Sequence, residues 1–295
     1  MNQHRRVEYA AILFLTAIWG SAFAFIKIAV DTFTPGQLTL ARFIPTLPIF
    51  LWIAYRYRSQ LRLLRKSDWI KLGAAGICAT SIYNLGLNTG ETHVGAGLAS
   101  LVISLNPAFI LLGALIVRGE RVKSRFMVGM IVSFIGVFIL TLVRNGLGFD
   151  KTALSGIVFI LLCPLSWAAY TTLIHGVVER TGVMAATAAA SVIGTITMLP
   201  ALPFAFRDGI PTDQNAWLCV GFLGLFSTVI GFTIWSWLLQ RRGAARTGMV
   251  VYLNVVWGLL FAGLILGERI TWQTGSGALL ILTGVAIARR SGRSL

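Results

Sequence analysis

The fold is decided by a short polar corner that the chain contains twice, LIVRGERV at residues 115–122 and LILGERI at residues 264–270. Glu120 of the first corner and Glu268 of the second are 148 positions apart in a chain of 295 residues. The corner therefore recurs after half the length of the chain. This spacing predicts that the chain consists of two repeats.

The same shift of 148 positions aligns other rare residues, and it needs no gap. The aligned pairs are Trp19 with Trp167, Trp69 with Trp217, Asn106 with Asn254, Gly95 with Gly243, Gly129 with Gly277, and Gly136 with Gly284. A generic apolar composition would align Leu with Leu rather than Trp with Trp. We therefore divide the chain into a first repeat, residues 1–147, and a second repeat, residues 148–295.

The composition excludes a soluble domain. Hydrophobic residues make up 56% of the chain and charged residues 12%, and the mean hydropathy is +0.80. One soluble core cannot bury that much apolar surface, so a polytopic membrane protein is expected. The net charge of +15 does not indicate nucleic-acid binding, because the basic residues lie in short loops between apolar spans.

Ten segments are long and apolar enough to span a bilayer, which takes roughly 20 apolar residues. They are residues 8–29, 36–55, 69–88, 95–117, 125–143, 153–174, 184–206, 215–238, 244–266 and 272–289. The first has basic flanks like a signal peptide, but it is too long and lacks a cleavage site. We therefore expect it to be an uncleaved membrane span. The sequence thus predicts an all-α membrane protein with ten transmembrane helices.

Loop charge predicts the orientation of these helices. The N-terminus, every second loop and the C-terminal tail carry 19 Lys and Arg, whereas the alternate loops carry 4. The positive-inside rule places both termini in the cytoplasm, and a bacterial inner membrane is the expected location. Because each repeat holds five spans, the second must cross the membrane in the opposite sense. Inverted repeats typically give a transporter one gate on each side of a central site.

Ionisable residues are absent from the predicted midplane. All ten acidic residues lie at or near span ends, and only Lys27 and Arg42 lie inside spans. Both basic side chains are close enough to the outer face to snorkel, and Arg42 has the alternative of an anion contact near an outer gate. The missing carboxylate favours facilitated movement, or weak coupling through end residues, over a dedicated proton relay. Phosphorylated substrates would also need more Lys and Arg.

Polar and aromatic residues near mid-span are the candidates for substrate binding. They are Trp19, Tyr83, Asn84, Asn106, Phe109, Trp167, Tyr170, Asn254 and Trp257. Asn106 and Phe109 share a helix face, as do their mirrored partners Asn254 and Trp257, and Pro107 frees a carbonyl near Ile103. The structural alternative is that amides join helices and aromatics fill the bundle. The mirrored arrangement favours a binding site.

Such a site, with aromatic walls, amides and no fixed central charge, suits a small zwitterion. A hydrophobic cation or an uncharged metabolite is the alternative. No metal site, disulfide or cofactor is expected, because the three cysteines lie singly in apolar stretches and form no Cys-x-x-Cys pair.

Small residues form a smooth stripe on two of the predicted spans, with Gly129, Ser133 and Gly136 on one and Gly277 and Gly284 on the other. Small faces allow close helix packing. We expect these spans to brace their own halves at the periphery of a monomer, with a dimer contact as the alternative.

The chain resembles the drug/metabolite transporter superfamily, specifically its EamA-type members. Three stretches carry the resemblance: AIWGSAF (17–23), LNPAFILLGALIVRGERV (105–122) and LGERITWQTGSGALLILTGVAIA (266–288). It implies a central cavity lined largely by spans 1, 3, 4, 6, 8 and 9, and a structural role for the Gly-Glu-Arg corners Gly119–Arg121 and Gly267–Arg269. Within the superfamily the chain is similar to YddG-type amino-acid exporters. The family usually has proline in spans 4 and 9, but Val255 replaces the second, so span 9 is expected to be less kinked.

The expected function is therefore export of small metabolites, with neutral and aromatic amino acids as the leading substrates. The hairpins of spans 3–4 and 8–9 would rock around Asn106 and Asn254 in alternating access. A membrane enzyme is disfavoured because the apolar spans hold no paired carboxylates or clustered histidines. A lipid-moving protein is an alternative on the same fold. The expected partners are the small-molecule substrate and membrane lipid.

Overall fold

The computed structural model describes residues 3–118, 124–125, 127–129, 131–133, 135–136, 151–248, 250–269 and 271–290. Throughout these ranges the regular structure is helical, and none of the described residues forms a strand. The predicted all-α class is confirmed for this part of the chain. The first Gly-Glu-Arg corner, Gly119–Arg121, lies outside the described residues.

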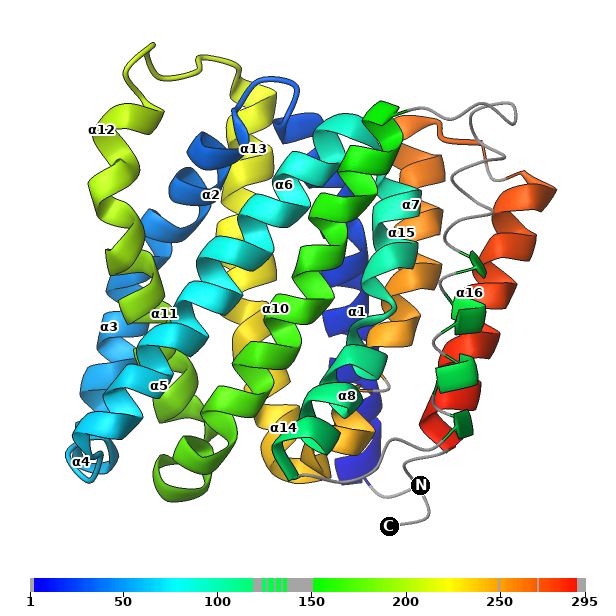
Figure 1. Ribbon diagram of the computed structural model, residues 1–295. Coiled ribbons are helices and arrows are strands. Elements are labelled where there is room, and N and C mark those ends of the chain that lie inside the picture. Colours follow the sequence, from blue (N-terminus) through cyan, green and yellow to red (C-terminus); the bar gives the residue numbers. More distant parts are fainter. Residues whose placement is uncertain are drawn as a thin grey trace.

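The helices of both halves run along a common axis (Figure 1). In the first half they are α1 (Gln3–Ala29), α2 (Pro35–Phe43), η1 (Ile44–Thr46), α3 (Leu47–Arg56), α4 (Arg58–Leu61), α5 (Lys66–Gly76), η2 (Ile77–Ile82), α6 (Tyr83–His93), α7 (Ala96–Ile103) and α8 (Asn106–Arg118). In the second half they are α10 (Lys151–Thr181), α11 (Val183–Met198), η3 (Leu199–Ala201), α12 (Leu202–Ala205), α13 (Gln214–Phe222), η4 (Leu223–Ile230), α14 (Gly231–Gly248), α15 (Val251–Leu266) and α16 (Trp272–Arg290).

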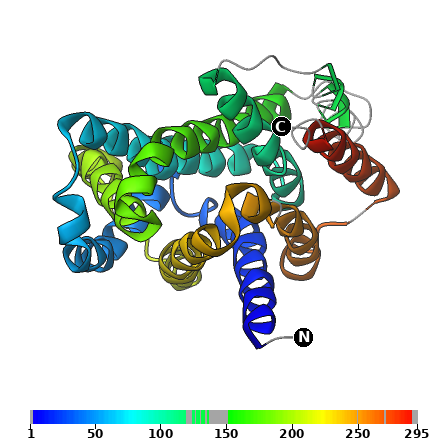
Figure 2. The same cartoon turned by 90° about the horizontal axis from the view of Figure 1, so that it is seen from below.

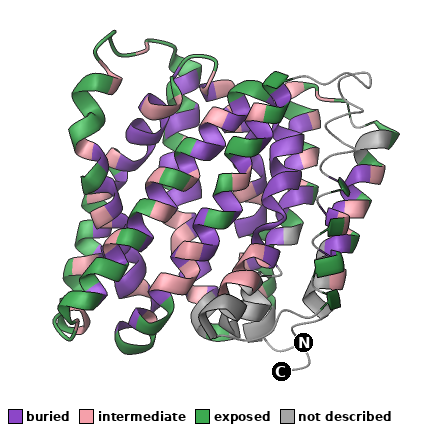
Figure 3. Cartoon of the chain, viewed as in Figure 1, coloured by how far each residue is buried: buried purple, intermediate pink, exposed green. Residues whose placement is uncertain are grey.

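The outer surface of the bundle is apolar, as a bilayer requires. Ile70, Leu218 and Leu264 are 74%, 73% and 72% exposed, and exposed and buried residues alternate around the helices (Figure 3). Among the described residues, five helical stretches are long and apolar enough to cross a membrane: Arg6–Ala29, Pro35–Arg56, Lys151–Thr181, Val183–Ala205 and Gln214–Leu238. A soluble protein would not expose so many large apolar side chains.

The directions of the helices agree with the loop charges. The beginning of α1 and the end of α16 lie at the same end of the bundle, which is the end that also carries α4 (Figure 1). α1 and α10 run in opposite directions along the bundle (Figure 1). The first helices of the two halves are therefore antiparallel.

A break between α7 and α8 follows from Pro107. Because proline has no N–H to donate, it removes a bond from the helical ladder and favours a break, although α10 continues past Pro164. α7 ends at Ile103, and the Ser104 hydroxyl donates to the Leu101 carbonyl over 2.6 Å. In the second half, α14 ends at Gly248 and α15 runs from Val251 to Leu266, so the helices of predicted span 9 are divided before Val251 and not beside Val255. Val255 itself lies inside a continuous helix.

Two π-helical segments, η2 and η4, occur at corresponding places in the two halves. Residues 77–82 of η2 correspond under the shift of 148 to residues 225–230, which lie within η4. A π-helical turn is rare and occurs frequently at functional sites, because it widens the helix and redirects side chains. Both segments contribute residues to the central pocket described below.

Helices of one half pack against helices of the other half. α1 packs along α15, and α10 packs along α8 (Figure 2). At the first contact a Cβ added to Gly20 would lie 2.3 Å from the Trp257 Cβ. Where α15 packs on α7, a Cβ added to Gly258 would lie 2.5 Å from the Ser100 Cβ. Glycine is therefore required at both positions for the helices to approach so closely.

The small-residue stripes pack against each other, so the prediction that they brace their own halves is wrong. The Ser133 hydroxyl donates to the Ile281 carbonyl over 3.1 Å. A Cβ added to Gly136 would lie 3.1 Å from the Gly277 carbonyl oxygen, and one added to Gly284 would lie 2.5 Å from the Gly129 carbonyl oxygen. Small side chains allow this backbone contact between the halves, which the sequence pattern alone did not distinguish from bracing.

Candidate functional site

A pocket of about 70 Å³ lies between the two halves. Its walls are formed by Trp19, Ala22, Phe23, Ile26, Arg42, Ala79, Tyr83, Asn84, Leu87, Ile103, Asn106, Trp167, Ser227, Phe232, Val251 and Asn254. None of these residues is acidic. A volume of this size holds a few water molecules, so a larger ligand requires the walls to move apart.

The pocket is built largely from corresponding positions of the two halves. Five pairs of lining residues are 148 positions apart: Trp19 and Trp167, Ala79 and Ser227, Asn84 and Phe232, Ile103 and Val251, and Asn106 and Asn254. These pairs account for ten of the sixteen lining residues. The pocket therefore lies where corresponding surfaces of the two halves face each other.

Aromatic rings form one wall of the pocket. The Trp19 ring lies 6.5 Å from the rings of Trp167 and Phe232, in edge-to-face geometry with both. The Tyr83 ring lies 5.5 Å from Trp167. The Trp19 indole N–H donates to the Ser227 carbonyl over 3.0 Å, within η4. Edge-to-face contacts and this hydrogen bond fix the orientation of the rings.

Arg42 is the charged residue of the pocket, and snorkelling to the outer face is wrong for it. Its side chain is buried, and it donates to the Thr228 hydroxyl over 2.8 Å, to the Asn84 amide oxygen over 2.9 Å and to the Ser227 hydroxyl over 3.2 Å. Since these acceptors lie on η4 and α6, they turn the guanidinium inward. The pocket thus contains a fixed positive charge that the sequence analysis did not expect.

The three bonds leave part of the Arg42 guanidinium available. A guanidinium has five N–H donors, and the acceptors found for it use three of them. All three acceptors are neutral oxygens. The positive charge is therefore held in place by dipoles and is not cancelled by a carboxylate in the pocket.

Asn106 and Asn254 offer hydrogen-bond acceptors, whereas Arg42 offers donors. Both are buried, and neither amide oxygen has a hydrogen-bond partner. They lie on α8 and α15, at corresponding positions of the two halves. Buried acceptors without a donor are rare, because each costs part of its desolvation free energy. Two such oxygens at one pocket are open to a donor that is not part of the protein, such as water or a ligand.

The structure brings together seven of the ten residues that the sequence singled out. These are Trp19, Arg42, Tyr83, Asn84, Asn106, Trp167 and Asn254. Phe109, Tyr170 and Trp257 do not line the pocket.

The three remaining candidates have other surroundings. Tyr170 packs against Trp167, and its hydroxyl lies 3.5 Å from that of Thr187. Trp257 stacks on Phe261, and its indole N–H donates to the Thr16 hydroxyl over 3.1 Å, within the contact between α1 and α15. Phe109 packs at the edge of a hydrophobic cluster. Residues three apart share a helix face, but only Asn106 and Asn254 of these pairs line the pocket, and Phe109 and Trp257 do not.

Three polar or aromatic lining residues, Phe23, Ser227 and Phe232, were not singled out from the sequence. The shift of 148 could have found Phe232, because it corresponds to the candidate Asn84. Ser227 corresponds to Ala79, which was not a candidate, so the repeat gave no signal for it.

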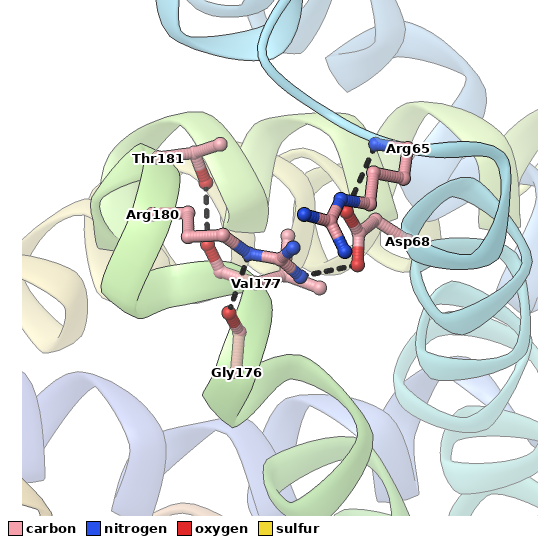
Figure 4. Close-up of polar contacts among 6 residues, drawn as sticks. All are labelled: Arg65, Asp68, Gly176, Val177, Arg180 and Thr181. Carbon is pink, nitrogen blue, oxygen red and sulfur yellow. Dashed lines mark hydrogen bonds and ion pairs between the residues drawn. The ribbon is translucent and has the colours of Figure 1, made fainter.

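Polar links join the halves at each end of the bundle. At the end that carries α4, Arg180 of α10 pairs with the buried Asp68 of α5, and the Arg65 N–H donates to the same carboxylate over 2.9 Å (Figure 4). The Arg65 N–H and the Arg180 guanidinium hold the pKa of Asp68 below its ordinary value, although burial opposes them. At the other end, Glu268 accepts from the backbone N–H groups of Ala96 and Gly97 over 2.9 and 3.3 Å.

The profile of the EamA-like transporter family matches residues 7–142 and again residues 154–290. An uncharacterised transporter of Archaeoglobus fulgidus is 31% identical over 96% of this chain and 99% of its own length. A protein of Escherichia coli named "probable amino-acid metabolite efflux pump" is 27% identical over 96% of this chain and 94% of its own length.

Two further similarities extend this set. A protein of Streptantibioticus cattleyicolor named "probable terminal-alkyne amino-acid exporter" is 26% identical, over 95% of this chain and 92% of its own length. A crystal structure superposes with a TM-score of 0.64, covering 95% of this chain and 96% of that chain at 22% identity. At this identity the superposition shows a shared fold.

Proposed function

The chain belongs to the EamA-like transporter family, and from this premise we propose that it exports neutral amino acids through the central pocket. It is a multi-pass membrane protein of a family of transporters, which are not enzymes. The proposal names the substrate class, the mechanism and the residues that bind. We also infer a bacterial inner membrane as its location.

The observation that carries the substrate class is the separation of charge chemistry in the pocket. Arg42 offers N–H donors and a positive charge on the side of α2 and η4, whereas Asn106 and Asn254 offer two amide oxygens without donors. A zwitterionic amino acid matches both, since its carboxylate accepts from Arg42 and its ammonium donates to the amides. The aromatic wall would hold its side chain.

Arg42 also separates this proposal from its alternative. A hydrophobic cation would gain from the faces of Trp19 and Trp167, but it would be repelled by a guanidinium whose charge no pocket carboxylate cancels. The corresponding position in the second half is Ala190, so a single positive charge orients the substrate. Amino acids are therefore favoured over cationic drugs and over lipids.

The mechanism that we propose is alternating access between two inverted repeats with boundaries at residues 147 and 148. The double match to one family profile, the antiparallel directions of α1 and α10, and the five corresponding pairs at the pocket support it. Inverted repeats can exchange conformations, and this opens the site to either side in turn. The links at Asp68 and Glu268 would close the respective ends.

Counterflow in liposomes that contain the purified protein tests this function. Liposomes loaded with unlabelled amino acid should take up labelled neutral amino acid, and aromatic and aliphatic amino acids should compete. Amino-acid amides, which lack the carboxylate, should compete poorly, and quaternary cations should not compete. Exchange of cations or lipid in place of amino acids would contradict the proposed substrate while leaving the fold unchanged.

A further inference from the structure

Glu91 is an acidic residue that the pocket does not use, and it is buried. It lies in the last turn of α6, near the span end where the sequence places it, yet it has no exposed surface. Neither of its carboxylate oxygens has a hydrogen-bond partner.

Close helix packing explains how Glu91 becomes buried. A Cβ added to the neighbouring Gly90 would lie 2.8 Å from the Gly156 carbonyl oxygen and 2.3 Å from the Ile160 side chain. α6 and α10 are therefore in backbone contact beside Glu91, which closes that side of the residue to solvent. A buried acidic group without a hydrogen-bond donor is most stable when it is neutral or when it binds a cation.

The charged and titratable groups around Glu91 come from several helices. Lys27 of α1 is half-buried, and its ammonium donates to the Glu91 backbone carbonyl over 2.6 Å. Its positive charge attracts the Glu91 carboxylate, whereas the charge of Glu268 repels it. The others are Cys163 of α10, Tyr83 and His93 of α6, and Arg42 of α2, whose guanidinium is bound to Asn84 two turns away.

Glu91 and Glu268 have opposite surroundings. Glu268 accepts two backbone N–H groups at the beginning of α7, where a helix offers unpaired donors and a partial positive charge. Glu91 lies in the last turn of α6, where the partial charge is negative and the N–H groups are already used by the helix. The negative charge is therefore stabilised on Glu268, and a proton is stabilised on Glu91.

A polar face of α6 connects Glu91 with the pocket. Asn84, Asn88 and Glu91 are spaced by four and three residues, so they lie on one face of the helix. All three are buried, and Asn84 lines the pocket. The Asn88 amide donates to the Thr39 hydroxyl over 3.0 Å, while its oxygen has no partner. The face thus places an open acceptor between Glu91 and the substrate site.

We propose that Glu91 is a proton-binding site that couples outward movement of the substrate to inward movement of a proton. In one state a proton from the outer solution forms an O–H bond with a Glu91 oxygen. In the other state that bond breaks and the proton passes to the cytoplasmic solution. The proposal rests on the transport function proposed above and replaces facilitated movement with exchange. A buried carboxyl group in a membrane span is a common element of such coupling.

Two assays on the same liposomes separate this proposal from the transport function. Counterflow needs exchange of the pocket between the two sides and no net proton movement, whereas uptake driven by a pH gradient needs both. Wild-type protein should show both activities. The variant Glu91→Gln keeps the shape of the side chain but cannot release a proton. It should keep counterflow and lose more than about nine-tenths of the gradient-driven uptake, because loss of a proton-transfer group typically lowers a rate by roughly tenfold or more.

Two further variants serve as controls. Glu91→Asp keeps an ionisable carboxyl group and should restore part of the driven uptake. Glu179→Gln removes a carboxylate at the surface, where the side chain is 69% exposed, and should leave both activities unchanged. If Glu91→Gln retained driven uptake, or if wild-type protein showed counterflow without any response to the gradient, the coupling role would be wrong while the exporter function stood.

An infrared spectrum tests the protonation itself without any substrate. Purified wild-type protein at neutral pH should show the absorption of a protonated carboxyl group, and Glu91→Gln should lack it, with Glu179→Gln unchanged. Absence of this absorption from wild-type protein would overturn the proposal even if no amino acid were transported. Its presence with failed counterflow would contradict the proposed substrate and leave the proton site supported.

Discussion

Ser133 and Ile281 occupy the same position in the two halves, 148 residues apart, and they touch: the Ser133 hydroxyl donates to the Ile281 carbonyl over 3.1 Å. Corresponding positions can contact each other only where an axis that relates the halves passes close to both. Gly136 beside Gly277 and Gly284 beside Gly129 are likewise images of one contact under this shift. The relation supports the two-fold arrangement of repeats proposed for the transport mechanism.

The glycine contact at this axis should be sensitive to added volume. Gly136→Ala and Gly284→Ala should each lower the free energy of unfolding by about 1–3 kcal/mol, because overpacking forces the helices apart. The two effects should be similar in size, since the contacts correspond. Thermal unfolding in detergent measures both. The control is Gly176→Ala in α10, where an added Cβ meets no neighbour within 4 Å; equal destabilisation by the control would contradict this interpretation.

Removal of the Arg42 charge should weaken the binding of substrates that carry a carboxylate. The variant Arg42→Met should reduce amino-acid binding by roughly 30-fold or more, since truncating a buried charge pair costs about 2–5 kcal/mol. Competition by amino-acid amides, which lack the carboxylate, should change little. Counterflow with both competitor series measures the difference, and Arg207→Met, at an exposed position, is the control. An equal loss for acids and amides would place the carboxylate elsewhere.

The two asparagines should contribute similarly to binding of the ammonium group. Asn106→Leu and Asn254→Leu remove amide oxygens that have no partner in the protein, so each should lower affinity by about 10- to 100-fold, as a hydrogen bond to a charged group is worth about 1.5–3 kcal/mol. Neither variant should unfold the protein, because no internal bond to these oxygens is lost. Titration calorimetry in detergent gives the affinities. If affinity changed by less than about threefold in both variants, the lost free energy would be smaller than that of one such hydrogen bond. The amides would then not bind substrate.

The sequence identified the all-α membrane class from its apolar spans, and the repeat pointed to most of the residues that line the candidate site. Trp19, Trp167, Asn106 and Asn254 were found by their spacing of 148, and they line the pocket. Trp257 was misplaced because helical spacing gives the face of a residue but does not say that α15 packs on α1 along that face.

The burial of two charged residues, Arg42 and Glu91, was not predicted, for a different reason. Distance from the end of a predicted span does not measure how far a side chain is buried. Burial depends instead on neighbouring helices, and both residues are covered by contacts between segments far apart in the chain, as the bond from Arg42 to Thr228 shows. Sequence periodicity carries no information on such contacts.

Acid should weaken the link between α5 and α10. The Arg65 N–H and Arg180 hold the pKa of Asp68 below its ordinary value of 3.8. A lowered folded-state pKa contributes stability that is complete above the unfolded-state pKa and is lost as the pH falls through the folded-state value. The Tm of wild-type protein should therefore decline below about pH 4–5. Asp68→Asn should lower Tm at pH 7 and flatten this decline, whereas Asp208→Asn at the surface should change neither.

Locking one end of the bundle should stop transport. Glu268 and Ala96 are joined across the halves, with 2.9 Å between the carboxylate and the Ala96 nitrogen, so cysteines introduced at both positions lie within reach of a short thiol-specific crosslinker. Cys78, Cys163 and Cys219, the three native cysteines, form no disulfide and would first be replaced by serine or alanine. The crosslinked protein should still bind amino acid from one side but lose counterflow, because alternating access needs this end to open. Each single-cysteine protein treated with the reagent should retain its rate. If the crosslinked protein exchanged at the full rate, Glu268 and Ala96 would move together through the cycle, and the outer gate would have to lie between other helices.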